Sequence, residues 1–319
     1  MQTQIIFTQI LILSILVIVG ILASKAGVIT TETKDFLAKI IFNITLPLML
    51  LCNFSRINIT PEILSNSLIV IVLTLLVLLF MLFFSWLTTR IFKMTKRESS
   101  IFKAHSVFGN IIYLGFPLIF ALYGEEGLLY ASMFQLVSNM LMWTVGVIIL
   151  NQGKETTIWQ NVKHVLNPNT FAILIGFIMF LFSLKLPPVL MKSFGALGDS
   201  NTNLSMLYIG SMMFYTSLKG VLNNKEVYLL TINKLILVPC LLLSIFAGWN
   251  LFFPGEINVL VVSVLLMQAA MPAMVNIVIM AKIFGADDQL GTANVFVSTI
   301  ISLLTLPLLL LMIEYFFIS

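Results

Sequence analysis

The sequence predicts an all-α integral membrane protein, and three observations lead to this prediction. Hydrophobic residues make up 60% of the chain and charged residues only 9%, whereas soluble domains carry about 25% charged residues. Apolar runs long enough to cross a bilayer as helices of ~20 residues recur along all 319 residues. Two of these runs contain helix-breaking residues near their middle. We therefore expect ten transmembrane helices, arranged as two inverted five-helix repeats with crossing broken helices.

The first half of the chain contains five expected spans. Their length and continuity favour helices over the shorter, alternating strands of a membrane barrel. No basic residue precedes the first run, which exceeds the apolar part of a signal peptide, so we expect it to remain as a span. The third span follows Thr60-Pro61, an N-cap residue with a proline suited to the first helical position. The five spans are residues 5–23, 36–54, 63–87, 103–122 and 127–150.

The second half contains five further spans. The sixth follows Asn167-Pro168, which has the same helix-start pattern as Thr60-Pro61. The tenth run is long and has room to tilt. These spans are residues 168–186, 204–222, 227–249, 257–281 and 289–317.

Basic residues set the orientation, because loops rich in Lys and Arg stay in the cytoplasm. Of the 17 Lys and Arg residues, 14 fall in the loops after spans one, three, five, seven and nine, and only Arg56, Lys185 and Lys192 fall on the other side. We therefore expect a multi-pass protein of the plasma or inner membrane with both termini outside the cytoplasm. The cytoplasmic set is Lys25, Lys34, Lys39, Arg90, Lys93, Lys96, Arg97, Lys103, Lys154, Lys163, Lys219, Lys225, Lys234 and Lys282.

A short polar loop at residues 151–167 divides the chain into two repeats, residues 5–150 and 168–317. Each repeat has five spans. Because five is odd, the second repeat starts on the opposite side of the membrane from the first, so the repeats must be inverted. The acidic loops at corresponding places in the two repeats agree with this inversion. Glu125-Glu126 is expected outside the cytoplasm and Asp287-Asp288 in the cytoplasm.

One segment in each repeat interrupts its own helix. The segments are residues 106–117 and 268–276. Aligning the loops that follow them places Asn110 on Met271, next to Pro272. Unwound backbone leaves N–H and C=O groups unsatisfied in hydrocarbon, so it persists only where it lines a cavity or a site. A matched pair of interrupted segments indicates the substrate site of a transporter.

The chemistry of such a site favours an anion. A broken helix exposes free N–H groups at the start of its second half, and this end carries partial positive charge. Two such ends, with amide and hydroxyl donors, can hold a carboxylate without a fixed cation. No Lys or Arg sits centrally in spans four, five or nine, which agrees with this arrangement.

Asn110 is the strongest candidate residue, because its amide can donate a hydrogen bond to a carboxylate. It can also cap the broken helix, and the two roles are compatible. Gly109 lets the backbone bend and approach a ligand, or allows close helix packing. Pro272 removes a backbone donor and opens the second helix, or merely kinks it. We expect Gly115 and Pro117 to shape the second half-helix rather than to touch substrate.

Four more polar residues are candidates for lining the site. Gln268 and Asn276 lie four residues on either side of Pro272 and either line the site or bridge helices. Ser138 and Asn139 lie deep in span five, with a helix–helix hydrogen bond as the alternative. His105, near the cytoplasmic end of span four, is expected to be an interfacial histidine first and a proton-handling group second.

The sequence lacks the motifs of several other classes of membrane protein. All 13 acidic residues fall in loops or near span ends, so no carboxylate sits at the membrane centre, where proton relays place one. The sequence contains no Walker A motif, no His-Glu-x-x-His pattern and no intramembrane aspartate pair, which argues against ATP drive, an enzyme or a cofactor. Sodium binding through carbonyls and neutral side chains stays open. The net charge of +4 belongs to the loops and does not suggest nucleic acid.

Several motifs resemble those of the auxin efflux carrier family, which includes plant PIN-type auxin carriers and bacterial organic-acid permeases. Residues 109–124 are similar to the family's fourth-helix crossover, and residues 268–282 are similar to its ninth-helix crossover. Leu46-Pro47-Leu48 in span two and Thr305-Leu306-Pro307 in span ten also fit. The resemblance covers nearly the whole chain.

The resemblance implies a ten-helix inverted-repeat fold related to bile-acid symporters and to sodium/proton carriers such as NhaA. It also implies two subdomains. A scaffold of residues 5–54 and 168–222 forms a homodimer in relatives, and residues 63–150 and 227–317 form a mobile transport subdomain.

The resemblance further implies roles for particular residues. In PIN-type relatives, the asparagine that matches Asn110 contacts the substrate carboxylate, and a polar pair in the fifth helix matches Ser138 and Asn139. The serine in the second helix of the plant proteins has no clear counterpart, because Leu50 and Leu51 occupy that region. A small acid such as malate or malonate is therefore a better candidate than auxin.

Together these observations predict a secondary transporter for a small organic anion, with an elevator-like motion. Efflux, uniport or exchange is expected, and sodium- or proton-coupled uptake is the alternative. A channel or a membrane sensor is the alternative from another class.

Overall fold

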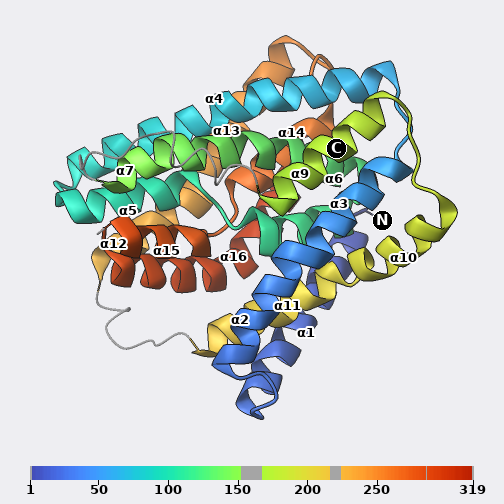
Figure 1. Cartoon of the computed structure of the whole chain (residues 1–319). Coiled ribbons are helices and arrows are strands. Elements are labelled where there is room, and N and C mark those ends of the chain that lie inside the picture. Colours follow the sequence, from blue (N-terminus) through green and yellow to red (C-terminus); the bar gives the residue numbers. More distant parts are fainter. Residues whose placement is uncertain (1, 152–166, 216–223, 285, 318–319) are drawn as a thin grey trace. The chain divides into compact units, whose positions relative to one another are not determined.

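Helices dominate the computed structural model, which describes residues 2–151, 167–215, 224–284 and 286–317 (Figure 1). Within these residues, the only β-type contact is an isolated bridge between Gly109 and Ala273. The chain is therefore an all-helical, multi-pass membrane protein. Among the described residues, five segments are long and apolar enough to cross a membrane: Thr31–Arg56, Pro61–Ile91, Ile111–Asn151, Lys225–Phe252 and Asp288–Phe317. Shorter apolar helices cover Leu11–Lys25, Pro168–Leu181 and Val259–Ala269.

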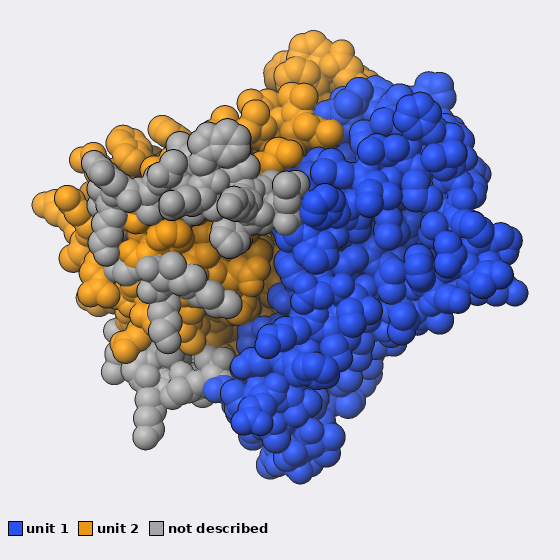
Figure 2. Space-filling model, viewed as in Figure 1, with its two compact units in different colours: residues 1–70, 112–136, 166–216 blue, residues 71–111, 137–165, 217–319 orange. Residues whose placement is uncertain are grey.

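The chain divides into two compact units, each built from segments that are distant in the sequence (Figure 2). Unit 1 comprises residues 1–70, 112–136 and 166–216, and unit 2 comprises residues 71–111, 137–165 and 217–319.

Unit 1 contains the first helices of both halves of the chain. Its helices are α1 (Gln2–Lys25), α2 (Thr31–Ile40), α3 (Leu46–Arg56), α9 (Pro168–Leu181), α10 (Pro188–Asp199) and α11 (Asn201–Tyr215). A π-helical turn, η1 (Ile41–Thr45), joins α2 to α3. The unit also contains the start of α4 (Pro61–Ile91), most of the π-helical turn η2 (Ile111–Gly115) and most of α6 (Phe116–Leu141).

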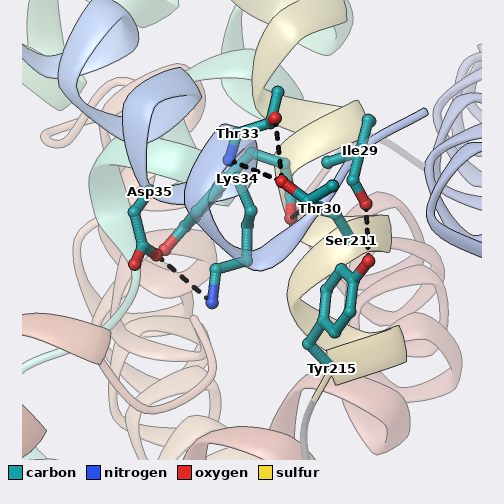
Figure 3. Close-up of polar contacts among 8 residues, drawn as sticks. Ile29, Thr30, Thr33, Lys34, Asp35, Ser211 and Tyr215 are labelled. Atoms are coloured by element: carbon teal, nitrogen blue, oxygen red, sulfur yellow. Dashed lines mark hydrogen bonds and ion pairs between the residues drawn. The ribbon is translucent and has the colours of Figure 1, made fainter. Parts of the chain in front are cut away.

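Small residues let the helices of unit 1 approach closely. A Cβ atom added at Gly210 on α11 would lie 2.1 Å from the Val17 carbonyl oxygen on α1, and one at Gly20 would lie 2.5 Å from that of Leu207. Figure 3 shows the loop after α1 beside the end of α11, where the Tyr215 hydroxyl donates to the Ile29 carbonyl oxygen at 2.7 Å. These contacts make α1 and α11 a tightly packed pair.

Unit 2 contains the segments with the helix breaks. Its helices are the rest of α4, α5 (Lys96–Val107), the end of α6, α7 (Val147–Asn151), α12 (Lys225–Ile232), α13 (Val238–Phe252), α14 (Val259–Ala269), α15 (Val275–Phe284) and α16 (Asp288–Phe317). Two further π-helical turns are η3 (Met142–Gly146) and η5 (Asn233–Leu237). Helix α16 packs against α5, α12, α13, α14 and α15. It is therefore the helix on which the other elements of the unit converge.

Helices occupy every expected span over the described residues, with two differences. Helix α10 lies between expected spans six and seven, where no helix was predicted. Gly124 has φ 64° and ψ −149°, so α6 is two helical segments that meet at this glycine, between expected spans four and five. The π-helical turns were not predicted. Most of the loop at residues 151–167 and the end of expected span seven lie outside the described residues.

Candidate functional site

Both predicted helix breaks are present in the structure. Helix α5 starts at a capping box, in which Thr95 and Glu98 bond each other's backbone N–H groups. It ends at Val107, and Phe108 then has extended backbone with φ −94° and ψ 115°. Helix α14 ends at Ala269 and α15 begins at Val275. The chain is thus unwound around residues 108–110 and 270–274.

The two breaks meet in unit 2. The Asn110 backbone N–H donates to the Pro272 carbonyl oxygen at 2.7 Å, and Gly109 forms an antiparallel bridge with Ala273. A Cβ atom at Gly109 would lie 2.9 Å from the Met271 Cβ and 3.1 Å from its carbonyl oxygen. A side chain at position 109 would therefore push the two segments apart.

Buried side chains satisfy two of the backbone groups that the second break exposes. The Ala273 N–H donates to the Ser298 Oγ at 3.0 Å. The His105 Nε2 bonds the Met274 carbonyl oxygen at 3.1 Å, and its Nδ1 lies 3.3 Å from the Asn294 Nδ2. Because a carbonyl only accepts and an amide nitrogen only donates, these contacts fit a neutral ring protonated at Nε2. His105 is fully buried inside the protein, and its position relative to the membrane interface stays a prediction.

Gln268 is the most unusual of the predicted site residues. It lies at the end of α14, one residue before its last residue, and is 1% exposed. Among the residues that the structure describes, neither its Oε1 nor its Nε2 atom has a hydrogen-bond partner. A buried amide without partners costs free energy, about 1–3 kcal/mol per group. This side chain is therefore suited to bonding a polar ligand.

The other predicted site residues are not part of the contact between Asn110 and Pro272. Asn276 is half-buried in the first turn of α15. Ser138 and Asn139 are buried near the end of α6 and belong to unit 2. Gly115 and Pro117 are buried where η2 gives way to α6, and they belong to unit 1. The direct contact thus joins Gly109, Asn110 and Pro272, while roles for the others stay predictions.

Sequence reasoning missed Lys234, which it counted among the cytoplasmic loop charges. Lys234 lies on the π-helical turn η5, is fully buried, and donates from Nζ to the Ser106 carbonyl oxygen at 3.0 Å. Its neighbour Asn233 donates from Nδ2 to the Ser106 Oγ at 3.4 Å. A basic side chain is therefore bonded to the end of α5, immediately before the first break. An ionisable residue inside an apolar run is a functional signal by itself.

Paired helix breaks inside an apolar helical unit are the mark of membrane transport proteins. The family model described as membrane transport protein matches residues 5–310. The chain belongs to this family, the auxin efflux carrier family that its crossovers resemble. It is a family of membrane transporters and not of enzymes.

Curated relatives match the chain over nearly its whole length. An uncharacterized transporter of Methanocaldococcus jannaschii is 24% identical over 306 residues, which cover 94% of this chain and 96% of the relative. An uncharacterized transporter of Escherichia coli K12 is 22% identical over 304 residues, covering 92% and 93% of the two chains. A third, from Methanothermobacter thermautotrophicus, is 22% identical over 296 residues and covers 92% and 94%.

Proposed function

We propose that this chain is a secondary transporter that binds a small organic anion where its two helix breaks meet. The observation that carries the proposal is the hydrogen bond from the Asn110 N–H to the Pro272 carbonyl oxygen, which joins the two breaks inside unit 2. Discontinuous helices in transporters hold substrate at such points, because their unpaired backbone groups coordinate it.

The groups around the breaks favour a carboxylate. Helix α15 begins immediately after the second break, and its N-terminal N–H groups carry partial positive charge. The Asn110 side chain is 1% exposed and can donate from its amide, and the buried Gln268 amide has donor capacity to offer a ligand. Malate, malonate and auxin-like carboxylates are the candidate substrates, the two small acids being favoured.

The division of the chain into two compact units supports an elevator-like motion. Unit 1 contains the helices of the expected scaffold, but it also contains residues 112–136 of the expected transport subdomain, and unit 2 contains both breaks. We propose that the part with the breaks carries the anion between the two faces of the membrane, and that the scaffold forms a homodimer as in relatives. The ten helices would then form two inverted repeats.

The membrane potential favours outward movement. An interior-negative membrane drives anion exit by about 2.3 kcal/mol per charge per 100 mV, so efflux, uniport or exchange needs no coupling ion. Uptake of a monoanion would need a proton or sodium ion. A channel or sensor would differ from a carrier in showing unitary currents or no saturable flux.

Replacing Asn110 with Ala tests the binding site. Loss of a hydrogen bond to a charged carboxylate costs about 1.5–3 kcal/mol, so the Kd for the anion should rise roughly tenfold or more. The measurement is ligand-induced thermal stabilisation of the purified protein, with malonate, malate and indole-3-acetate as probes. Asn43→Ala, at an exposed asparagine on η1, is the control and should bind normally.

Two results would count against the proposal. Unchanged binding by a folded Asn110→Ala protein would remove Asn110 from the site. Failure of the unaltered protein to bind any of the three acids would reject a site for this class of anion.

A further inference from the structure

Lys234 and Asn233 hold the end of the first half-helix. The π-helical turn η5 directs both side chains to Ser106 on α5, the Lys234 Nζ to its carbonyl oxygen and the Asn233 Nδ2 to its hydroxyl. Ser106 precedes Asn110 by four residues. Single π-helical turns, which insert one extra residue into an α-helix, occur frequently at functional sites. They redirect side chains within a continuous helix. Lys234 therefore meets the carbonyl end of the broken helix.

No acidic group balances Lys234 among the described residues. It takes part in none of their ion pairs, which join Lys34 to Asp35 and Arg56 to Glu125 and Asp199. On the helices packed against it, acidic residues stand only in the first turns of α5, α12 and α16 and near the end of α16. His105 on α5 is neutral by its two hydrogen bonds. His105 thus supplies no charge that could balance Lys234.

The helix end compensates an ammonium group only in part. The carbonyl end of a helix has a partial negative charge, roughly half an elementary charge, which attracts a cation. A full buried charge requires a full opposite charge and further hydrogen bonds. Lys234 has three N–H donors, and the structure gives one of them a partner in the Ser106 carbonyl oxygen. The ammonium group therefore has charge and donor capacity that an anionic partner would match.

We infer that Lys234 is the resident cation of the anion site, and that its ammonium group balances the charge of the bound carboxylate. This inference rests on the proposed function and deepens it. By occupying the carbonyl end of α5, the ammonium removes the repulsion that these carbonyls would exert on an anion. It also fills the position to which an inorganic cation would be attracted. The site should therefore require a negative charge on its ligand and bind it without sodium.

Lys234→Met is the first test, because methionine keeps much of the length of lysine without its charge. The protein is the full chain, purified in detergent. In the absence of an anion, Lys234→Met should unfold at the same or a higher temperature, because a buried uncompensated charge has been replaced by an apolar group. Its Kd for malonate should rise tenfold or more. The control is Lys225→Met, an exposed lysine on α12, which should leave both measurements unchanged.

Lys234→Ala with a small amine is the second test. Propylammonium has the three carbons and the nitrogen that this variant lacks. Propylammonium should restore malonate binding, whereas 1-propanol, which has the same shape without charge, should not. Sodium, potassium and choline salts should be interchangeable for the unaltered protein.

Three results would overturn the inference. The first is malonate binding by Lys234→Met with an unchanged Kd, and the second is equal rescue of Lys234→Ala by 1-propanol. The third is a lower unfolding temperature of Lys234→Met without anion, which would leave capping of α5 as the whole role of the lysine. If the unaltered protein binds none of the probe acids, the proposed function is wrong. The unfolding temperature of Lys234→Met without anion then still shows whether the charge of Lys234 is uncompensated.

Discussion

Gly109 lies against Met271 where the two breaks meet, so it should tolerate no side chain. In Gly109→Ala the new methyl group would lie 2.9 Å from the Met271 Cβ. Overpacking of this kind costs about 1–3 kcal/mol, and we expect a lower unfolding temperature and weaker malonate binding. Gly248→Ala on α13 is the matched control, because nothing lies within 4 Å of its added Cβ. Thermal unfolding of both variants measures the difference. Equal stability of the two would mean that the breaks separate without cost.

Some residues of the candidate site were predictable from the sequence and others were not. Gly109, Asn110 and Pro272 were predictable because glycine, asparagine and proline are unusual together in an apolar run. Lys234 was not predictable, because a lysine near the start of a span ordinarily extends its amine to the membrane surface. Its burial depends on packing against α5 and α16, which the sequence of its own helix does not specify.

Ser298 on α16 supports the unwound element between α14 and α15. Its hydroxyl accepts the Ala273 N–H at 3.0 Å, so Ser298→Ala should leave a buried donor unpaired at a cost of about 1–3 kcal/mol. Ser302→Ala is the control one turn further along, because the Ser302 hydroxyl is equally buried and donates to the Thr299 carbonyl oxygen of its own helix. Thermal unfolding should separate the two variants. If both lose the same stability, the contact with Ala273 contributes nothing measurable.

The helical elements were predictable from hydrophobic length, but their π-helical turns were not. In hindsight, three of these turns share one physical cause. Proline follows η1 at Pro47, η2 at Pro117 and η5 at Pro239, in each case as the second residue of the next helix. Proline lacks an N–H and clashes with the preceding turn, so the helix widens before it. A proline inside an apolar run therefore predicts a widened turn before it, and η5 brought Asn233 and Lys234 to Ser106 in this way.

At the scale of the whole molecule, composition sufficed for the class of protein. A chain this apolar has to be an integral membrane protein, and the helices and the family both confirm a multi-pass transporter. The inverted repeat, the scaffold and the homodimer remain predictions. Substrate identity was beyond the sequence for a physical reason. Backbone N–H groups and amide side chains recognise any carboxylate, so the shape around them selects among acids.

The orientation of the whole molecule can be tested with two matched cysteine variants. Glu32 and Glu256 are both exposed glutamates, and the distribution of basic residues predicts that Glu32 lies in the cytoplasm and Glu256 outside. Cys52 and Cys240, which are free thiols, would first be replaced with alanine. On intact cells, a membrane-impermeant maleimide should label Glu256→Cys and not Glu32→Cys, and both should react after the membrane is permeabilised. The reverse pattern would invert the orientation. Burial of Lys234 lowers the predicted cytoplasmic set from 14 to 13 basic residues against three, so the predicted orientation is unchanged.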